Sequence, residues 1–383
     1  MNDLDAIDRI KQDYQVVLKL TPVKEHGAMG LLNLDLGGKK LKPKPFTLMC
    51  SQFATILKAG IPIARTIHLI ADKTTDKTLK NLLLQVGEDV ESGRSVAASF
   101  HDRGKDFLPP TFVETIRAGE ESGSLDRSFE SMYVHYDKTV KMRAKVRSAL
   151  AYPLFVLAVA VVVVIVLMVK VVPTFMAIFD SLGTEMPVMA KMLIGMSNFF
   201  KHNIIIMVII VVAIIIAVKV YGNTENGRLN LAKWSLKLPV LGNIITLNAA
   251  AQFANSMTAL QGAGLPLNRA IGITAKTLDN YLISQKVGKL TLELEQGRAL
   301  GESMREIREL PDILVDMVGV GEETGELEET MKTVAMYFDS ELETAINAAM
   351  AKLEPTLLVV LAGIVGFIVI AIYGSMFSMY AAM

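Results

Sequence analysis

The chain contains two copies of one long sequence pattern, and this duplication limits the folds it can adopt more than any other feature. An acidic segment, GEESGSL at 119–125, returns as GEETGEL at 321–327. Two further motifs precede it in each copy, GIPI and ESGRS in the first, GLPL and EQGRA in the second. A proline then begins a long apolar run, Pro153 in one copy and Pro355 in the other. Because order and spacing are nearly kept, we interpret the chain as a tandem duplication and name the copies the first and second repeat.

Composition lies between that of soluble and fully membrane-embedded proteins. Hydrophobic residues make up 51% of the chain and charged residues 20%, with a formal net charge of zero. Zero net charge gives no electrostatic reason to expect a nucleic-acid partner. The single cysteine, Cys50, excludes an internal disulfide framework and a multi-cysteine metal site. The acidic start, MNDLD, has no apolar h-region, so we expect no cleavable signal peptide and insertion through internal spans.

Residues 1–45 are expected to form an N-terminal segment and linker. Leu4, Ile7, Ile10 and Tyr14 fall at helical spacing, which predicts a short amphipathic helix. The following GGKK and PKP segments, at 37–40 and 43–45, indicate a basic, extended linker. We prefer a tethered helix with a linker to a dedicated partner-docking arm.

Both repeats are predicted to be bundles of about six helices, over 46–150 and, with a leading linker, over 222–354. Each repeat has a glycine and a nearby proline where one helix should stop and the next begin, and further glycines at its acidic turn. These predicted structural turns are Gly60, Pro62, Gly119, Gly123, Gly264, Pro266, Gly321 and Gly325. The predicted fold class is therefore all-α.

Three apolar runs are long enough to be transmembrane helices, at 151–172, 203–221 and 355–377. The first two carry one lysine near the end, Lys170 and Lys219, where the side chain can reach the headgroups, and the third has no charge. Pro153 and Pro355 mark where the first and third runs begin. We also expect one continuous helix from Leu125 to Val169, with a kink at Pro153.

Basic residues around these runs predict the orientation of the chain. The approach to the first run is rich in lysine and arginine, the 173–202 loop is poor in them, and the segment after the second run is rich again. We therefore expect both bundles in the cytoplasm, the 173–202 loop in the periplasm, and a periplasmic tail at 378–383. The middle span would return the chain so that the second bundle shares a side with the first.

The acidic turns are the first candidate site. Glu120, Glu121 and Asp126 have the counterparts Glu322, Glu323 and Glu328. Carboxylates at this spacing could begin an oxygen-ligand site for a divalent cation, or could complement the dipole of a following helix. We prefer the second interpretation, predict no metal, and regard the six carboxylates as a candidate partner interface.

A basic run before the first span is the second candidate site. Lys141, Arg143, Lys145 and Arg147 could set the topology or hold anionic lipids, and we favour topology. The matching segment of the second repeat is acidic, with Asp339, Glu341 and Glu343. From this difference we expect the two segments to contact different neighbours.

Recognisable catalytic motifs are missing from the sequence. There is no phosphate-binding GxxxxGK[ST], no HExxH and no GxSxG segment, and the spans have no central acid, histidine or arginine. We therefore expect no enzyme and no cofactor, and a protein that acts by contact. A transporter or channel subunit remains an alternative, although three spans offer few polar groups for a pore.

Taken together, these motifs resemble the inner-membrane platform proteins of type II secretion and type IV pilus machines, the GspF/PilC family. The resemblance covers nearly everything from Phe46 to Tyr380. It rests on the paired motifs above, on ALAYP at 149–153, on VPTF at 172–175 and on LPVLG at 238–242. The second repeat departs from it slightly, with Thr324 in place of Ser122 and Glu328 in place of Asp126, which leaves the branch of the family open.

The resemblance implies a non-enzymatic platform in the bacterial inner membrane. Members of the family bind a hexameric cytoplasmic ATPase and couple it to the insertion or extraction of pilin or pseudopilin subunits. Other inner-membrane components of the machine, membrane lipids and further molecules of the same chain are the remaining expected partners, and nucleic acid is not among them.

Overall fold

A computed structural model describes residues 41–167, 170, 174 and 188–382, and within them every regular element is a helix. This confirms the predicted all-α class. The helix predicted near the N-terminus and, within the predicted 173–202 loop, residues 173 and 175–187 lie outside the described residues. In chain order the helices are α2 (Pro43–Lys58), α3 (Ile63–Lys73), α4 (Lys77–Glu91), α5 (Val96–Gly104), α6 (Pro110–Glu121), α7 (Leu125–Val166), α9 (Val188–Tyr221), α10 (Glu225–Lys237), α11 (Leu241–Gly262), α12 (Leu267–Thr277), α13 (Tyr281–Glu295), α14 (Leu300–Met304), α15 (Asp312–Thr324) and α16 (Leu327–Ala382).

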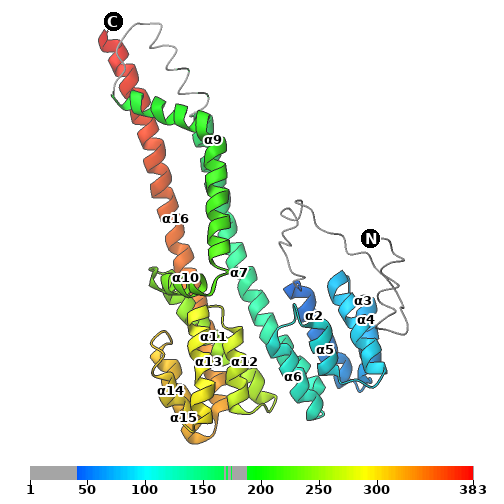
Figure 1. The fold of residues 1–383 in the computed structure, drawn as a ribbon. Coiled ribbons are helices and arrows are strands. Elements are labelled where there is room, and N and C mark those ends of the chain that lie inside the picture. The colour runs from blue at the N-terminus through cyan, green and yellow to red at the C-terminus, as the bar shows by residue number, and fades with distance from the viewer. Residues whose placement is uncertain (1–40, 168–169, 171–173, 175–187, 383) are drawn as a thin grey trace, which may run out of the picture. The chain divides into compact units, whose positions relative to one another are not determined.

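The first hydrophobic core is formed by α2 to α6 and the beginning of α7 (Figure 1). Four fully buried phenylalanines from α2, α5, α6 and α7 lie at its centre, namely Phe53, Phe100, Phe112 and Phe129. The rings of Phe53 and Phe129 stack with centroids 4.3 Å apart, and the other ring pairs meet edge to face. Such contacts stabilise a core beyond simple burial of area, and they tie α7 to the rest of the bundle.

The second core is formed by α11 to α15 and the beginning of α16. Its central helix, α11, is rich in buried alanine, with Ala249, Ala250 and Ala254 nearly inaccessible to solvent. Small side chains let neighbouring backbones approach closely, and α11 packs along α16. Phe253 of α11 and Phe338 of α16 are the buried aromatic side chains at this contact.

The turns of the two repeats match in conformation as well as in sequence. Six glycines have positive φ and form three equivalent pairs: Gly60 and Gly264, Gly93 and Gly297, Gly123 and Gly325. Glycine is the residue that takes this conformation without a steric cost, so each of these positions ends a helix. Pro62 and Pro266 then occupy the N-cap positions of α3 and α12. Equivalent residues therefore break the helices in both repeats.

The last helix of each core continues far beyond it. α7 is 42 residues long, about 63 Å at 1.5 Å per residue, and α16 is 56 residues long. Both run without interruption through an internal proline, Pro153 in α7 and Pro355 in α16. The continuity predicted for α7 is confirmed as far as Val166, whereas the kink stays a prediction. Among the described residues, these two helices are long and apolar enough to cross a membrane.

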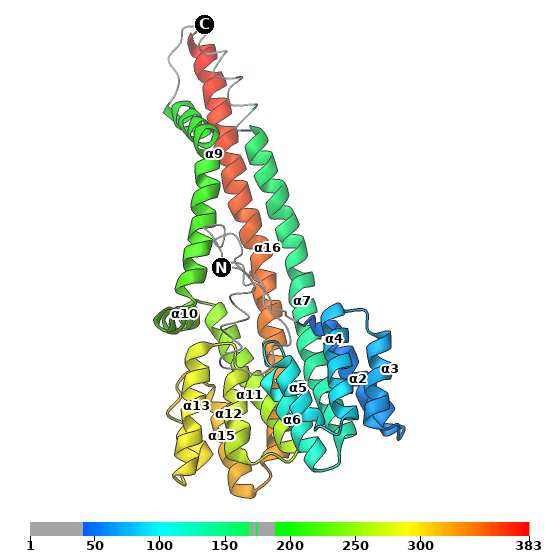
Figure 2. The same cartoon turned by 45° about the vertical axis from the view of Figure 1, so that its right-hand side comes forward.

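The helix α9 contains the second apolar run but begins before it. The sequence places 188–202 in a loop, whereas the structure has helix from Val188 onward. Methionine, which favours helices, occurs three times in this stretch, and the stretch contains no proline. α9 lies beside α16 (Figure 2). Within α9, Val212–Tyr221 is a shorter apolar helical stretch.

Candidate functional site

The carboxylate of Glu120, from the first acidic turn, is held by the N-terminus of a neighbouring helix. It accepts hydrogen bonds from the backbone N–H groups of Val96 and Ala97, at 2.7 and 3.0 Å, and from the Ser95 hydroxyl at 2.6 Å. The first N–H groups of a helix have no partner inside it, and the helix dipole favours a negative charge there. Glu120 thus ties the end of α6 to the start of α5.

Glu322 does the same in the second repeat. Its carboxylate oxygens accept from the backbone N–H groups of Leu300 and Gly301 at 2.7 and 2.9 Å, at the start of α14. Ala299 stands where the first repeat has Ser95, so the hydroxyl donor is missing. Asp126 and Glu328 lie in the first turns of the following helices α7 and α16, as expected. Glu120 and Glu322 complement a different helix dipole. The helix is not the one that follows the turn but a helix earlier in the repeat.

The glycines of the acidic turns have two separate roles. Gly119 and Gly321 allow close approach, since a Cβ at Gly119 would lie 2.1 Å from Ser128 Oγ and one at Gly321 would lie 3.0 Å from the Leu327 side chain. Gly123 and Gly325 have positive φ and end α6 and α15. Ser124 occupies the N-cap position of α7, but its side chain makes no capping hydrogen bond.

The remaining carboxylates of this candidate interface face solvent. Glu121, Glu323 and Glu328 are exposed, and Asp126 is half-buried. Within the described part of the chain, no three histidine, cysteine or acidic side chains are close enough together to hold a metal ion. The exposed carboxylates are therefore available for contacts with another molecule, whereas Glu120 and Glu322 are already engaged.

An acid–arginine–acid cluster, which the sequence analysis missed, occurs in both repeats. Arg94 pairs with Asp89 at 3.3 Å and Asp102 at 2.7 Å, and Arg298 pairs with Glu293 and Glu306, both at 3.0 Å. In the first repeat Arg103 also binds Asp89, and this hydrogen bond keeps the pKa of Asp89 below its usual value. The signal in the sequence was the recurrence of both acids around the duplicated glycine–arginine motif. The cluster fixes the turn between α4 and α5 in the first repeat, and the equivalent cluster fixes the turn between α13 and α14 in the second.

The basic run of α7 faces the acidic segment of α16. Lys138 binds Asp339 at 2.9 Å and Asn255 at 3.0 Å, and Lys145 forms an ion pair with Glu343. Asn255, from α11, in turn donates to Asp339 at 3.0 Å. The two segments therefore contact each other within the chain, and the expectation that they contact different neighbours stays a prediction for other molecules. The two helices run in the same direction, so their opposite charges lie side by side and attract each other. We name the contact made by Lys138–Asp339 and Lys145–Glu343 the α7–α16 junction.

The other members of the basic run have different surroundings. Lys141 pairs with Asp137 of its own helix at 2.7 Å, and this hydrogen bond raises the pKa of Lys141. Arg143 and Arg147 are exposed. Beside the junction, burial lowers the pKa of His135 to about 4, and the positive charge of Lys138 acts in the same direction. Its Nδ1 atom is buried without a hydrogen-bond partner, so His135 is neutral at pH 7.

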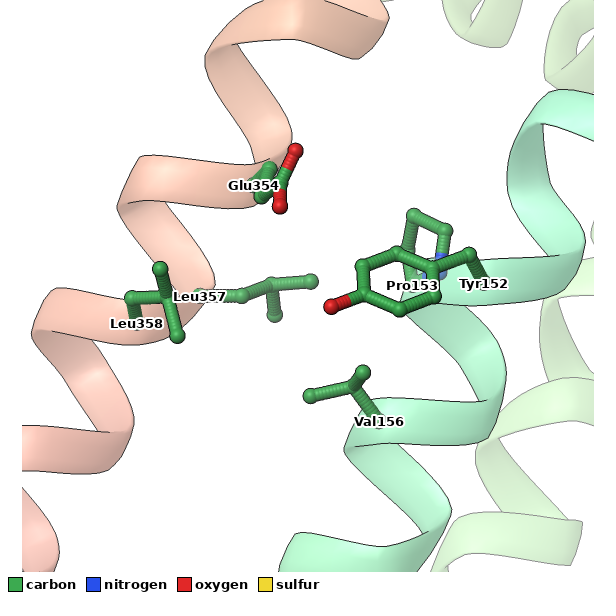
Figure 3. A pocket seen from close by; sticks show the side chains of 6 residues that line it. All are labelled: Tyr152, Pro153, Val156, Glu354, Leu357 and Leu358. Carbon is green, nitrogen blue, oxygen red and sulfur yellow. The ribbon is translucent and has the colours of Figure 1, made fainter.

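Pro153 and Pro355 lie at the same level of the two long helices. A shallow crevice between α7 and α16 is lined by Tyr152, Pro153, Val156, Glu354, Leu357 and Leu358 (Figure 3). The Tyr152 ring and the Leu357 side chain point toward each other from opposite sides of it. The two apolar stretches therefore begin side by side.

The arrangement defines a class of all-helical proteins in which two similar cores each continue into a helix suited to span a membrane. Comparison with known protein families agrees. The family described as type II secretion system (T2SS), protein F, matches residues 49–173 and 253–374, which fall in the first and second repeat respectively. The chain belongs to this family.

Curated relatives come from both branches of the family. The chain is 31% identical over 378 residues to the type IV pilus assembly protein TapC of Aeromonas hydrophila, covering 98% of this chain and 90% of that protein. It is 30% identical over 343 residues to PilC of Pseudomonas aeruginosa, covering 89% and 91%. It is 29% identical over 325 residues to the type II secretion system protein F of Aeromonas hydrophila, covering 85% and 84%.

Glu120→Ala should destabilise the first core by roughly 1–3 kcal/mol, because it leaves two helix N-terminal N–H groups without their acceptor. Glu322→Ala should do the same in the second core. The neighbouring exposed residues supply matched controls, since Glu121→Ala and Glu323→Ala remove a carboxylate that holds no helix end. Thermal unfolding of the detergent-solubilised protein measures the difference. Equal midpoints for Glu120→Ala and Glu121→Ala would contradict the capping role.

Stability should decrease as pH falls from about 6.5 toward 4.5. In this range the unfolded chain protonates His135 at its ordinary pKa, whereas the folded chain keeps it neutral, so protons favour unfolding by up to about 1.4 kcal/mol per pH unit. The lowered pKa values of Asp76 and Asp89 act only below about pH 4, because their ordinary value is 3.8. His135→Gln should flatten the dependence of the unfolding midpoint on pH, while His101→Gln, at an exposed position, should leave it unchanged. The same slope in both variants would refute this assignment.

Proposed function

We propose that the chain is a non-enzymatic inner-membrane platform protein of a type IV pilus or type II secretion machine. It couples a cytoplasmic hexameric ATPase to the insertion or extraction of pilin or pseudopilin subunits. Membership of the protein F family supports this role, as does the similarity to pilus assembly and secretion proteins over most of their length. A protein without catalytic machinery acts through the surfaces it presents and the movements it transmits.

The α7–α16 junction is the observation that carries the proposal. Each core is continuous with one long helix. The two helices are held to each other by Lys138–Asp339 and Lys145–Glu343, where α7 has left the first core and α16 is still packed in the second. A displacement of either core would therefore be passed along both helices into their apolar stretches. This is the mechanical property that a coupling protein needs.

We further propose three spans, at 151–172, 203–221 and 355–377, with both cores in the cytoplasm and the C-terminus in the periplasm. The parallel direction of α7 and α16 supports this topology, because both cores then lie at the same end of the helix pair. The chain between them must return across the membrane an odd number of times, and the apolar part of α9 is suited to do so. The segments before the first span and after the second are rich in lysine and arginine, whereas the loop between these spans is poor in them, and this pattern agrees with the proposed orientation.

The proposed partner contacts use charged side chains that form no ion pair among the described residues. Glu121, Asp126, Glu323 and Glu328 offer carboxylates to the ATPase or to another cytoplasmic component of the machine. Arg143 and Arg147 are exposed just before the first span, where they can meet anionic lipid headgroups at about 1 kcal/mol per charge.

Reversing one charge of the junction should uncouple the machine. Lys145→Glu places two carboxylates opposite each other, replacing an attraction with a repulsion, and should lower pilus assembly or substrate secretion in the host bacterium without removing the protein from the membrane. Adding Glu343→Lys restores opposite charges and should restore assembly. Arg143→Glu is the control, since it reverses a charge in the same run away from the junction. Quantification of surface pili or secreted substrate, with immunoblots of the membrane fraction, gives the result.

Two outcomes would count against the platform role. The first is full assembly or secretion in a strain that lacks the chain. The second is saturable solute flux through the purified protein in liposomes without any association with an ATPase or a pilin, which would favour a transporter or channel.

The proposed topology predicts which single cysteines a membrane-impermeant maleimide can label in intact spheroplasts. In a Cys50→Ala background, cysteine in place of Ser181 or Ala382 should be labelled, whereas cysteine in place of Glu121 or Glu323 should be labelled only after the membrane is opened. Glu121 and Glu323 labelled on opposite sides of the membrane would rule out the proposed arrangement.

A further inference from the structure

The two repeats pack against each other through unlike surfaces. α6 of the first repeat lies against α11 and α12 of the second. Arg269 of α12 forms an ion pair with Glu114 of α6 at 2.5 Å, Ala118 packs against the second core, and Ala259 of α11 is buried in the first. One side of this contact is an α6 surface and the other is an α11–α12 surface. The contact is therefore heterologous rather than two-fold symmetric.

Because the repeats are equivalent, each repeat has a counterpart of both surfaces. The contact between the repeats uses the α6 surface of the first and the α11–α12 surface of the second, so the other counterpart of each surface is not used in it. The counterpart of the α6 surface lies on α15 and consists of Ile313, Asp316, Met317 and Val320, which we name the α15 face. The counterpart of the α11–α12 surface lies on α2 and α3 and includes Thr55, Arg65 and Leu69, which we name the α2–α3 face. Nothing within the described part of the chain repeats the first contact at these two faces.

The exposure of the α15 face contrasts with that of its counterpart. Thr111 and Thr115 of α6 are 1% and 0% exposed, whereas Ile313, equivalent to Thr111, is 50% exposed. Val320, equivalent to Ala118, is 49% exposed. The covered row therefore carries small or hydroxyl-bearing residues, and the uncovered row carries large apolar ones. Exposed apolar side chains in a row along one helix mark a contact surface.

The charges repeat as well. Asp316 corresponds to Glu114, and Arg65 corresponds to Arg269, so the two residues that form the ion pair between repeats recur with the same signs. Both are exposed. Among the described residues Arg65 has no ion-pair partner, and Asp316 has only Arg305, at 3.8 Å with both side chains mostly exposed. Such a pair is weak and readily exchanged.

We propose that the α15 face of one molecule binds the α2–α3 face of a second molecule of the same chain. The contact reproduces the one between the repeats, with Asp316 pairing with Arg65 of the neighbouring molecule and Ile313 and Val320 covered by its α2 and α3. The occupant is identified by shape and charge, because the α2–α3 face is the nearest equivalent of the surface that already covers α6. This inference does not rest on the ATPase or pilin role.

The geometry also limits the kind of assembly. α7 and α16 run in the same direction, so the operation that takes the first repeat onto the second is close to a rotation about the long-helix direction. A heterologous contact repeated about one axis gives a ring or an arc, not a filament that leaves the plane. In the proposed topology this plane is the membrane.

Cross-linking between two tagged forms of the full-length chain tests the contact directly. Both forms carry Cys50→Ala, one with Asp316→Cys and the other with Arg65→Cys. When they are co-expressed and their membranes are treated with a short bismaleimide, which spans the gap left by the two long side chains, a cross-linked dimer carrying both tags is expected. Each form alone should give no cross-linked dimer. One chain that carries both cysteines should give dimers, trimers and larger species.

The contact between the repeats provides the matched control. Glu114→Cys together with Arg269→Cys in one chain should be cross-linked by the bismaleimide within the monomer, and no dimer should appear when the two substitutions are on separate chains. The proposal is overturned if Asp316→Cys and Arg65→Cys fail to cross-link while this control succeeds. A dimer formed by Asp316→Cys alone would indicate a two-fold contact, and capture of a different protein at that position would assign the face to it. Both results overturn the proposal.

Charge reversal gives a second, independent readout. Asp316→Arg should weaken self-association by roughly tenfold in mass photometry of the detergent-solubilised protein, because it faces Arg65 of the neighbour. Adding Arg65→Asp to the same chain restores opposite charges and should restore the assembly. Ile313→Ser should weaken association similarly, whereas Leu292→Ser, which changes an exposed apolar residue of α13 outside the α15 face, should not. An unchanged mass in Asp316→Arg and Ile313→Ser would refute the interface.

Discussion

The structure depends on one constraint, which is that the same helix must complete a water-soluble core and continue into an apolar environment. A helix satisfies its own backbone hydrogen bonds, so it is the element that can leave a packed core and enter lipid without exposing polar groups. α7 does this through Phe129, buried in the first core, and α16 through Phe338, buried in the second. Each core is thereby attached rigidly to its own apolar stretch, and the pairing of α7 with α16 attaches the cores to each other.

Duplication supplied the parts, and divergence gave them separate contacts. The turn glycines and the acid–arginine–acid clusters are retained in both repeats, because each repeat needs them to fold. The surfaces are not retained. α7 became basic where α16 is acidic, which turns equivalent helices into complementary ones. Thr111 in one repeat and Ile313 in the other show the same process on the short helices, where one surface is covered and its counterpart is not.

Much of this fold could be predicted from the sequence, because its signals are local. A glycine followed by a proline, as at Gly60 and Pro62, determines a helix boundary within a few residues, and a long apolar run predicts a long helix. The start of α9 was missed because 188–202 has helical propensity but little of the apolar purity that marks a span.

Contacts between distant residues were harder to predict. Glu120 was expected to complement the helix that follows it, yet it binds the start of α5, more than twenty residues earlier in the chain. Nothing in the spacing of an acidic turn specifies that target. Lys145 and Glu343 were likewise identified as charged segments, but helical periodicity indicates which residues share a face and not which face it meets. Both prolines lie inside their helices, at the start of the apolar runs, and their position opposite each other has a further effect. Proline lacks the N–H that would bond the carbonyl four residues earlier, so the ladder has a gap at Ala149 in α7 and at Ala351 in α16. The stiffness of both helices is therefore lowest at the same height, and any bending of the pair would concentrate there, just beyond the charges that bind the helices together.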